Sequence, residues 1–369
     1  MRREFMRVRG WRGQFCTSLQ AFFSKMSSGK SSFMVCDYSS VSLHVQNTKF
    51  TPPLFLAPMA GLTHSAFRRL VADFGGYGAL YTEMLSGTAL LNEKCGQTPF
   101  TRRRKQEGKV AYQLLLKGTE NIESVIERVA ALNPAALDLN LACPAPEIRK
   151  QQAGAMLFVD MPRLQQVVRR VRKAWSGILT AKCRLGGDPQ DWQQSFSERM
   201  RLLEDEGIDA IIVHPRFFKE KFKRLARWRY LPWIANQVRV PVIASGDIGS
   251  PDVLQKHAKY FGKIKGIMIG RMAVVKPWIF TEFSGSNLNV DYAEVWERYC
   301  SYVQEDFPET KAVGRIKQFS AYFARNFFYG HQFFSGIQNA SSLKQIISHA
   351  RKFFDSPPRV VLHPSVSGV

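Results

Sequence analysis

One cysteine in this sequence stands where a reactive side chain would be held firmly. Cys143 follows the apolar run 136–141, which contains Asn140, and prolines occupy positions 144 and 146. A thiol can act as a nucleophile or as a proton donor when the backbone fixes it beside a reactant. Isolated cysteines are more often buried and inert. Taken alone, Cys143 is therefore either a buried filler or a reagent held over a site.

Polar and small residues also follow other apolar runs. Two glycines and Arg271 end the last two runs, and such residues suit a phosphate, because glycine lets backbone N–H groups approach it closely. The alternative is that these are ordinary strand-to-helix turns, that His214 is a hydrogen-bonded core residue and that Lys182 extends toward solvent. The full set is Pro58, Met59, Ala60, Gln113, Asn140, Lys182, Arg184, His214, Ser245, Gly246, Asp247, Gly270 and Arg271.

The apolar runs predict the scaffold that would bring these residues together. Helix-patterned segments such as 119–132 and 191–207 lie between most of the runs, and this alternation predicts a parallel sheet. Eight repeats favour a closed (β/α)8 TIM barrel, in which the carboxyl ends of the strands carry the chemistry. A Rossmann fold is the alternative, but no GxGxxG follows any run. The runs are 54–58, 78–84, 110–116, 136–141, 178–185, 209–215, 240–246 and 265–270.

Composition divides the chain into four parts. Residues 1–50 form an Arg/Ser-rich extension that we expect to be poorly ordered apart from a short strand at 40–45, and that resembles either a transit peptide or an upstream extension. The barrel is expected over 51–283. Residues 290–355 have the pattern of a basic, aromatic, all-helical domain, and residues 356–369 read as a loose tail.

The net charge of +22 indicates a polyanionic partner. Nucleic acid is the first candidate and an acidic membrane surface the second, while a generally basic proteome would be the uninformative explanation. In the stretch 216–229, basic residues including Lys219, Lys221 and Lys223 alternate with aromatic ones, as phosphate contact and base stacking would require.

The cysteines and the hydropathy exclude some protein classes. Six cysteines without a CxxC pair argue against a disulfide framework or a zinc site and fit a reducing compartment. No apolar run approaches the roughly 18 residues that span a bilayer. We therefore expect a cytoplasmic, bacterial-type protein without membrane or metal partners, or an organellar one if the N-terminus is a transit peptide. We also expect a monomer.

Eight short signatures occur in order on the successive runs, and together they resemble the tRNA-dihydrouridine synthase family. The resemblance covers roughly residues 52–280, and the helical region matches the family's C-terminal RNA-binding domain in position and type. The signatures are LAPMAGLTHSAFRRL, TEM, YQLLLKG, LDLNLACPAP with AGAML, AKCRLG, IIVHPR, PVIASGDI and GIMIGR.

The resemblance implies an FMN enzyme that reduces the C5–C6 double bond of specific uridines in the D-loop of tRNA, with NADPH or NADH as electron donor. Hydride would go to C6, and Cys143 would deliver a proton to C5. Asn140 and Arg184 would contact the target uracil and its surroundings. From the basic stretch itself, we expect Lys219, Lys221 and Lys223 to contact tRNA phosphates. The implied flavin contacts are Pro58, Met59, Ala60, Gln113, Lys182, His214, Ser245, Gly246, Asp247, Gly270 and Arg271.

The sequence departs from the family pattern in three places. Ser245 replaces the usual Asn, Ala142 replaces the common Gly before the cysteine, and the residues after His214 differ from the commoner Arg-Thr-Arg form. Two other functions remain open from sequence. One is an FMN-barrel dehydrogenase of free pyrimidines, which would not explain the charge. The other is a non-catalytic RNA-binding barrel.

Overall fold

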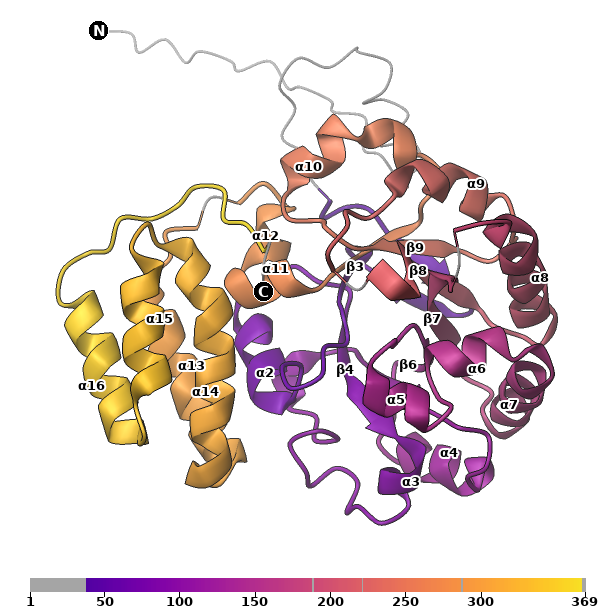
Figure 1. Ribbon diagram of the computed structural model, residues 1–369, viewed down its shortest axis with the longest axis horizontal. Helices are drawn as coiled ribbons and strands as arrows, with labels where there is room; N and C mark the ends of the chain where they lie inside the picture. Colours follow the sequence, from indigo (N-terminus) through magenta and orange to yellow (C-terminus); the bar gives the residue numbers. More distant parts are fainter. Residues whose placement is uncertain (1–37, 188, 221, 287, 367–369) are drawn as a thin grey trace, which may run out of the picture.

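The computed structural model describes residues 38–187, 189–220, 222–286 and 288–366, and its centre is a closed barrel of eight parallel strands (Figure 1). The strands follow one another around the barrel in chain order, and β10 closes onto β3. Each predicted run supplies one strand, so the predicted TIM barrel is confirmed. The strands are β3 (Leu54–Leu56), β4 (Ala79–Ser86), β5 (Val110–Leu115), β6 (Ala136–Leu141), β7 (Leu179–Gly186), β8 (Ala210–Phe217), β9 (Val242–Ser245) and β10 (Gly266–Ile269).

The helices between the strands bury one apolar side against the barrel. In α7 (Met161–Ala174), four buried residues recur at helical spacing, whereas Arg169 and Arg170 face outward and pair with Glu206 and Glu123. The basic side of α7 is thus an ordinary solvent-exposed helix face. The other longer barrel helices are α2 (Ser65–Phe74), α4 (Ile122–Ala130) and α8 (Trp192–Asp205), and the shorter ones are α3 (Gly87–Leu90), α5 (Pro146–Lys150), α6 (Ala155–Val159), α9 (Leu231–Ala235), α10 (Pro251–Lys256), α11 (Arg271–Val275) and α12 (Ile279–Glu282).

A hairpin closes the amino end of the barrel. Its strands are β1 (Leu43–Val45) and β2 (Thr48–Phe50), and its buried side chains pack onto inward-facing residues such as Phe55 and Ala79. The predicted short strand is confirmed by β1. Residues 38–50 are therefore folded against the barrel, while residues 1–37 lie outside the described part of the chain. The carboxyl ends of the strands are left as the open end.

Four helices form the predicted all-helical region beside α2 (Figure 1). Aromatic contacts join the two parts, for example between Phe67 and Phe319. Charged contacts join them too, because buried Asp306 accepts hydrogen bonds from Arg102 and Arg104 at 2.7 Å each. The helices are α13 (Tyr292–Asp306), α14 (Glu309–Phe323), α15 (Gly330–Asn339) and α16 (Leu343–Phe354). No helix in the described residues is long and apolar enough to cross a membrane.

The C-terminal segment is not the loose tail that its composition suggests. Val360 forms an isolated antiparallel bridge with Phe327, and the chain then runs from the helical region back to the barrel near α11 (Figure 1). Short-range composition carries no signal for such a long-range contact.

A buried ion pair fixes α2 to the long β4–β5 connection. The Arg68 Nε lies 2.7 Å from Glu107 Oε2, and both side chains are fully buried. The remaining guanidinium N–H groups donate to the carbonyl oxygens of Thr63 and Arg102. A buried pair of this kind is stable only while both partners and their hydrogen bonds are present.

Replacing Arg68 by Met should lower the free energy of unfolding by about 3–5 kcal/mol, because the Glu107 carboxylate stays buried without its partner. Denaturant unfolding checks this. The double variant Arg68→Met/Glu107→Leu should lose less than the single one. Arg69→Met, at the partly exposed pair with Glu305, serves as control and should cost about 1 kcal/mol or less. If Arg68→Met lost no more unfolding free energy than Arg69→Met, the prediction would be wrong.

Candidate active site

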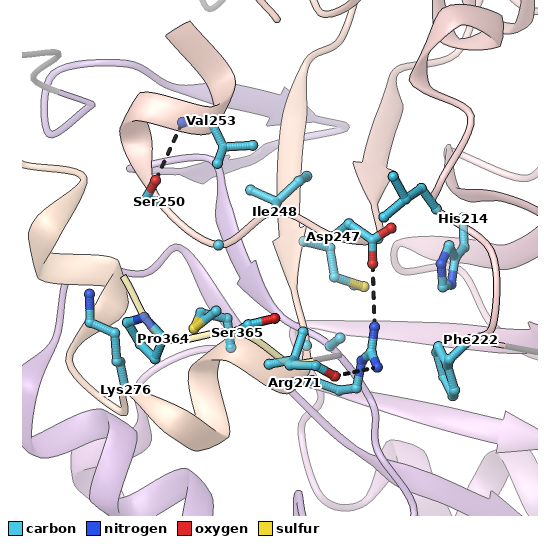
Figure 2. Close-up of a pocket in the computed structure, with 18 of the residues that line it drawn as sticks. His214, Phe222, Asp247, Ile248, Ser250, Val253, Arg271, Lys276, Pro364 and Ser365 are labelled. Atoms are coloured by element: carbon cyan, nitrogen blue, oxygen red, sulfur yellow. Dashed lines mark hydrogen bonds and ion pairs between the residues drawn. The ribbon is translucent and has the colours of Figure 1, made fainter. Parts of the chain in front are cut away.

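A cavity of about 690 Å³ opens at the carboxyl ends of the strands (Figure 2). The first loop, β7, β8 and the loops after β9 and β10 all contribute to its walls, as a TIM-barrel site requires. The predicted residues that line it are Pro58, Met59, Lys182, His214, Lys223, Gly246, Asp247, Gly270 and Arg271. The cavity is also lined by Arg216 and Phe222, which the sequence analysis assigned only to the basic stretch 216–229, and by the C-terminal residues Leu362–Val366, which it did not select.

The turn after β9 needs its glycine. Gly246 has φ +102°, and a Cβ at this position would lie 2.5 Å from Cδ2 of His214. Its carbonyl accepts a hydrogen bond from the indole of Trp228 at 2.9 Å. The turn leads to Ser250, whose hydroxyl caps α10 by accepting from the Val253 N–H. Backbone at this turn therefore approaches both the imidazole and the cavity closely.

His214 is a neutral imidazole. Its pKa is well below the usual value, because the ring is buried and because Arg184, Lys182, Arg216 and Arg271 surround it with positive charge. The Arg216 guanidinium donates to its Nε2 at 2.5 Å, so the ring proton belongs on Nδ1. His214 thus offers one N–H donor without adding a charge.

Asp247 balances the arginines of the cavity. Its carboxylate accepts two hydrogen bonds from Arg216, at 2.7 and 2.6 Å, and one from Arg271 at 3.3 Å. The Ala226 N–H donates to it as well, at 2.7 Å. Figure 2 shows Asp247 between His214 and Arg271. The carboxylate therefore positions the guanidinium groups, and a direct contact of Asp247 with a cofactor stays a prediction.

Lys182 presents a cationic side chain to the cavity. No hydrogen-bond or ion-pair partner reaches its ammonium group in the part of the chain that the structure describes. Burial, followed by the charge of Arg184, lowers the pKa of Lys182 to about 8, while Asp138 opposes this shift. At neutral pH the group is still mainly protonated. Such a lysine suits a ligand that presents hydrogen-bond acceptors or negative charge.

A row of polar side chains lies beneath this site. The Asp138 carboxylate accepts from Gln113 Nε2 and from the Thr180 hydroxyl, both at 2.6 Å. Gln113 Oε1 in turn accepts from Asn140 Nδ2 at 2.8 Å. Burial raises the pKa of Asp138 to about 6, although these hydrogen bonds and Lys182 favour its ionised form. The row fixes the amide of Asn140.

Asn140 then orients the loop that carries Cys143. Its Oδ1 accepts from the backbone N–H groups of Ala142 and Cys143, at 3.1 and 3.0 Å. The Cys143 carbonyl accepts from the Ala155 N–H at 3.1 Å, which draws the AGAML segment against the loop. The loop is thus anchored on both sides of the cysteine.

Cys143 itself is partly exposed and not in a disulfide. It lies close enough to Lys182 and Arg184 to interact with their charges. Cys143 does not line the cavity itself, and it packs beside Ile148 and Ala153. Its partial exposure and its nearness to Lys182 favour a reagent over a buried filler. The role of proton donor stays a prediction.

Several predicted residues lie beside the cavity rather than in its walls. Gln113 is buried within β5, Ser245 is buried at the end of β9, and Ala60 is exposed. Arg184 is 4% exposed, and burial followed by the charge of Arg216 lowers its pKa to about 10. Their proposed ligand contacts, like that of Asn140, stay predictions.

The basic stretch 216–229 is only partly available to a partner. Arg216 and Phe217 are buried, and Arg227 pairs with Glu220 at 2.5 Å. Lys219 and Lys223 are exposed, whereas Lys221 lies outside the described residues. Phe222 is 51% exposed and sits 4.4 Å from the Arg271 guanidinium. Sequence reasoning treated all basic residues of this stretch alike, because the pairing of Arg216 with Asp247, a residue outside the stretch, leaves no local signal.

Glu83 is a further residue whose role the sequence did not reveal. It lies within β4, and its Oε2 accepts from the Gly61 N–H at 2.6 Å. It therefore fixes the first loop of the cavity, which continues from Pro58 and Met59. Among the described residues, no group of three or more His, Cys, Asp and Glu side chains is arranged to hold a metal ion.

Asp138 should make stability depend on pH. Its folded-state pKa of about 6 exceeds its ordinary value of 3.8, so folding favours the protonated form. This stabilisation is complete below about pH 4 and is lost as the pH rises through 6. The unfolding free energy of the wild type relative to Asp138→Asn should fall by up to about 3 kcal/mol between pH 4 and pH 8. Denaturant unfolding across this range checks it, and a constant difference would refute it.

Comparison with known proteins agrees with this geometry. The family model described as dihydrouridine synthase (Dus) matches residues 55–355. A tRNA-dihydrouridine synthase B of Shewanella oneidensis is 31% identical over 62% of this chain and 70% of its own length. A probable tRNA-dihydrouridine synthase of Aquifex aeolicus is 29% identical over 80% of this chain and 91% of its own length.

Solved structures share the barrel. Morphinone reductase superposes with a TM-score of 0.52 at 9% identity, covering 70% of this chain and 92% of that one. A histamine dehydrogenase from Rhizobium gives 0.52 at 12% identity, covering 71% of this chain and 50% of that one. These two comparisons support the fold alone. The family match spans most of the sequence, and the chain belongs to the dihydrouridine synthase family, whose members are flavin-dependent oxidoreductases.

Proposed function

We propose that this enzyme reduces the C5–C6 double bond of specific uridines in tRNA, using FMN and a nicotinamide nucleotide, NADPH or NADH. The observation that carries the proposal is that Asn140 holds the backbone of Cys143, whose thiol lies near enough to the cavity residue Lys182 to interact with its charge. The similarity to two tRNA-dihydrouridine synthases supports tRNA as the substrate.

The residues of the cavity fit a flavin mononucleotide. Backbone of the Gly246 turn and the Arg271 guanidinium suit its phosphate, and the unpartnered Lys182 ammonium suits an acceptor atom of its ring. His214 contributes a neutral N–H donor. When bound, the flavin supplies hydride transfer from the nicotinamide to the pyrimidine.

The chain's own residues handle the proton. Reduction adds a hydride at C6 and a proton at C5, and Cys143 gives its thiol proton to C5. Asn140 fixes the backbone N–H of Cys143 and so sets the position of the thiol. Asp138 and Gln113 keep the Asn140 amide in the orientation that leaves Oδ1 toward the loop.

Two exposed lysines near the cavity suit the phosphates of tRNA. Lys223 lines the cavity and Lys219 lies on the same connection after β8. A uridine must leave its stack to reach a barrel mouth, which costs a few kcal/mol. Phosphate contacts beside the opening and along the helical region offset this cost. A dehydrogenase of free pyrimidines would gain nothing from the net charge of +22.

The purified enzyme, supplied with FMN, NADPH and unmodified tRNA, should produce dihydrouridine that mass spectrometry locates in the tRNA. The Cys143→Ala variant should keep its flavin absorbance and its slow NADPH oxidation but lose at least about 100-fold in tRNA reduction, because the proton donor is missing. Cys95→Ala, which changes a cysteine of the β4–β5 connection, is the matched control. Full turnover by Cys143→Ala would remove the proton-donor role, and absence of dihydrouridine with the wild type would remove the proposed function.

The variant Lys219→Glu/Lys223→Glu should bind tRNA more weakly, because two phosphate contacts become repulsive. The slope of log K against log salt should become shallower by about 2. Lys49→Glu/Lys109→Glu makes the same change of charge at the amino end of the barrel, where tRNA binding should change little. Fluorescence anisotropy at several salt concentrations measures both. If both variants weakened tRNA binding equally, the affinity would depend on the net charge of the protein and not on contacts of Lys219 and Lys223 with phosphates.

A further inference from the structure

We propose that the C-terminal segment 359–366 forms one wall of the flavin cavity and slows the release of the bound flavin. This inference rests on the proposed function, because the ligand is the FMN proposed above. Five consecutive residues of the segment, Leu362–Val366, line the same cavity as His214 and Arg271. In the view of Figure 2, Pro364 and Ser365 lie on the side of Arg271 away from Phe222.

The segment is anchored first to the helical region. The Val361 N–H donates to the Asn326 carbonyl at 2.7 Å, and the Phe328 N–H donates to the Arg359 carbonyl at 3.0 Å. The Arg359 guanidinium also lies 4.1 Å from the centre of the Phe328 ring. Asn326 is buried and donates its side-chain amide to the carbonyl of Val275 at the end of α11, so this anchor is itself joined to the barrel.

The second anchor lies inside the cavity. Arg271 Nη1 donates to the Val366 carbonyl at 3.1 Å, and the Val366 side chain packs against the main hydrophobic core. Arg271 also binds Asp247, so the segment is joined to the same charged group that fixes the turn after β9. The four residues between Val361 and Val366 are thus held at both ends.

A segment held at both ends acts as a wall rather than as a free tail. Leaving the cavity on this side requires the Arg271 to Val366 hydrogen bond to break or the segment to bend away, and either step adds to the barrier for release. Leu362 lines the cavity and yet is 83% exposed. An apolar side chain in this position gains contact when a ligand fills the cavity.

The segment could also weaken FMN binding, and the sign of the change after its removal distinguishes this effect from that of a wall. The Val366 carbonyl uses an N–H of Arg271 that a phosphate could use instead. If this competition dominated, removing the segment would tighten FMN binding. A wall instead predicts faster release after removal.

The test compares the full chain with a variant that ends at Val361, which keeps the first anchor and removes every lining residue of the segment. Both are loaded with FMN, and release is followed by the recovery of flavin fluorescence after dilution. The truncated chain should release FMN about tenfold faster, with a dissociation constant raised to a similar extent. Circular dichroism and thermal unfolding without FMN check that the truncated chain is folded.

A second variant of full length, Pro364→Gly/Val366→Gly, tests the wall without a new chain end and should release FMN about threefold faster. Tyr329→Ala, at an exposed position that does not line the cavity, is the control and should leave the rate unchanged. Release at the full-chain rate from both altered chains, or tighter binding after truncation, overturns the wall alone. A full chain that binds no FMN overturns the proposed function and the wall together.

Discussion

The arrangement of the cavity depends on the charge balance at Asp247. Arg216 is almost completely buried, and a guanidinium in such a place must be paired and fully hydrogen-bonded. The Asp247 carboxylate provides this, and it binds Arg271 and the Ala226 N–H at the same time. Three segments that are distant in sequence are thereby joined: the end of β8, the turn after β9 and the start of α11. The same network also selects the tautomer of the neutral His214 ring that carries its proton on Nδ1, because Arg216 donates to Nε2.

A second network, separate in its hydrogen bonds, serves the cysteine. It begins at the buried Asp138 carboxylate and passes through Gln113 to Asn140, whose Oδ1 holds the backbone on which Cys143 sits. Lys182 connects the two networks by charge, since it interacts with Asp138 of the second network and with His214 of the first. The site thus combines a rigidly positioned thiol with a cationic cavity. Loss of one hydrogen bond in either network would displace groups that are not its direct partners.

Much of the architecture was predictable from local pattern. Eight apolar runs predicted eight strands, because a strand covered on both faces needs continuous apolar residues. Their polar ends predicted the position of the site. The pairing of Arg216 with Asp247 and of Arg68 with Glu107 was not predictable, since residues 31 and 39 positions apart carry no joint periodicity. For the same reason the stretch 216–229 seemed more basic than its exposed surface is, and the path of residues 359–366 along the cavity could not be inferred from a Pro- and Ser-containing tail.

The first loop of the cavity is held between two parts of the molecule. Glu83 of the barrel accepts from the Gly61 N–H, and Arg315 of α14 donates to the Gly61 carbonyl at 2.9 Å. Asp306 of α13 likewise holds two arginines of the β4–β5 connection. As a consequence, the helical region is part of the framework that supports the catalytic end of the barrel. It is not an independent module that could be exchanged freely. A helical region exchanged between relatives would have to bring matching partners for Gly61 and for both arginines, and evolution of the two parts is therefore coupled.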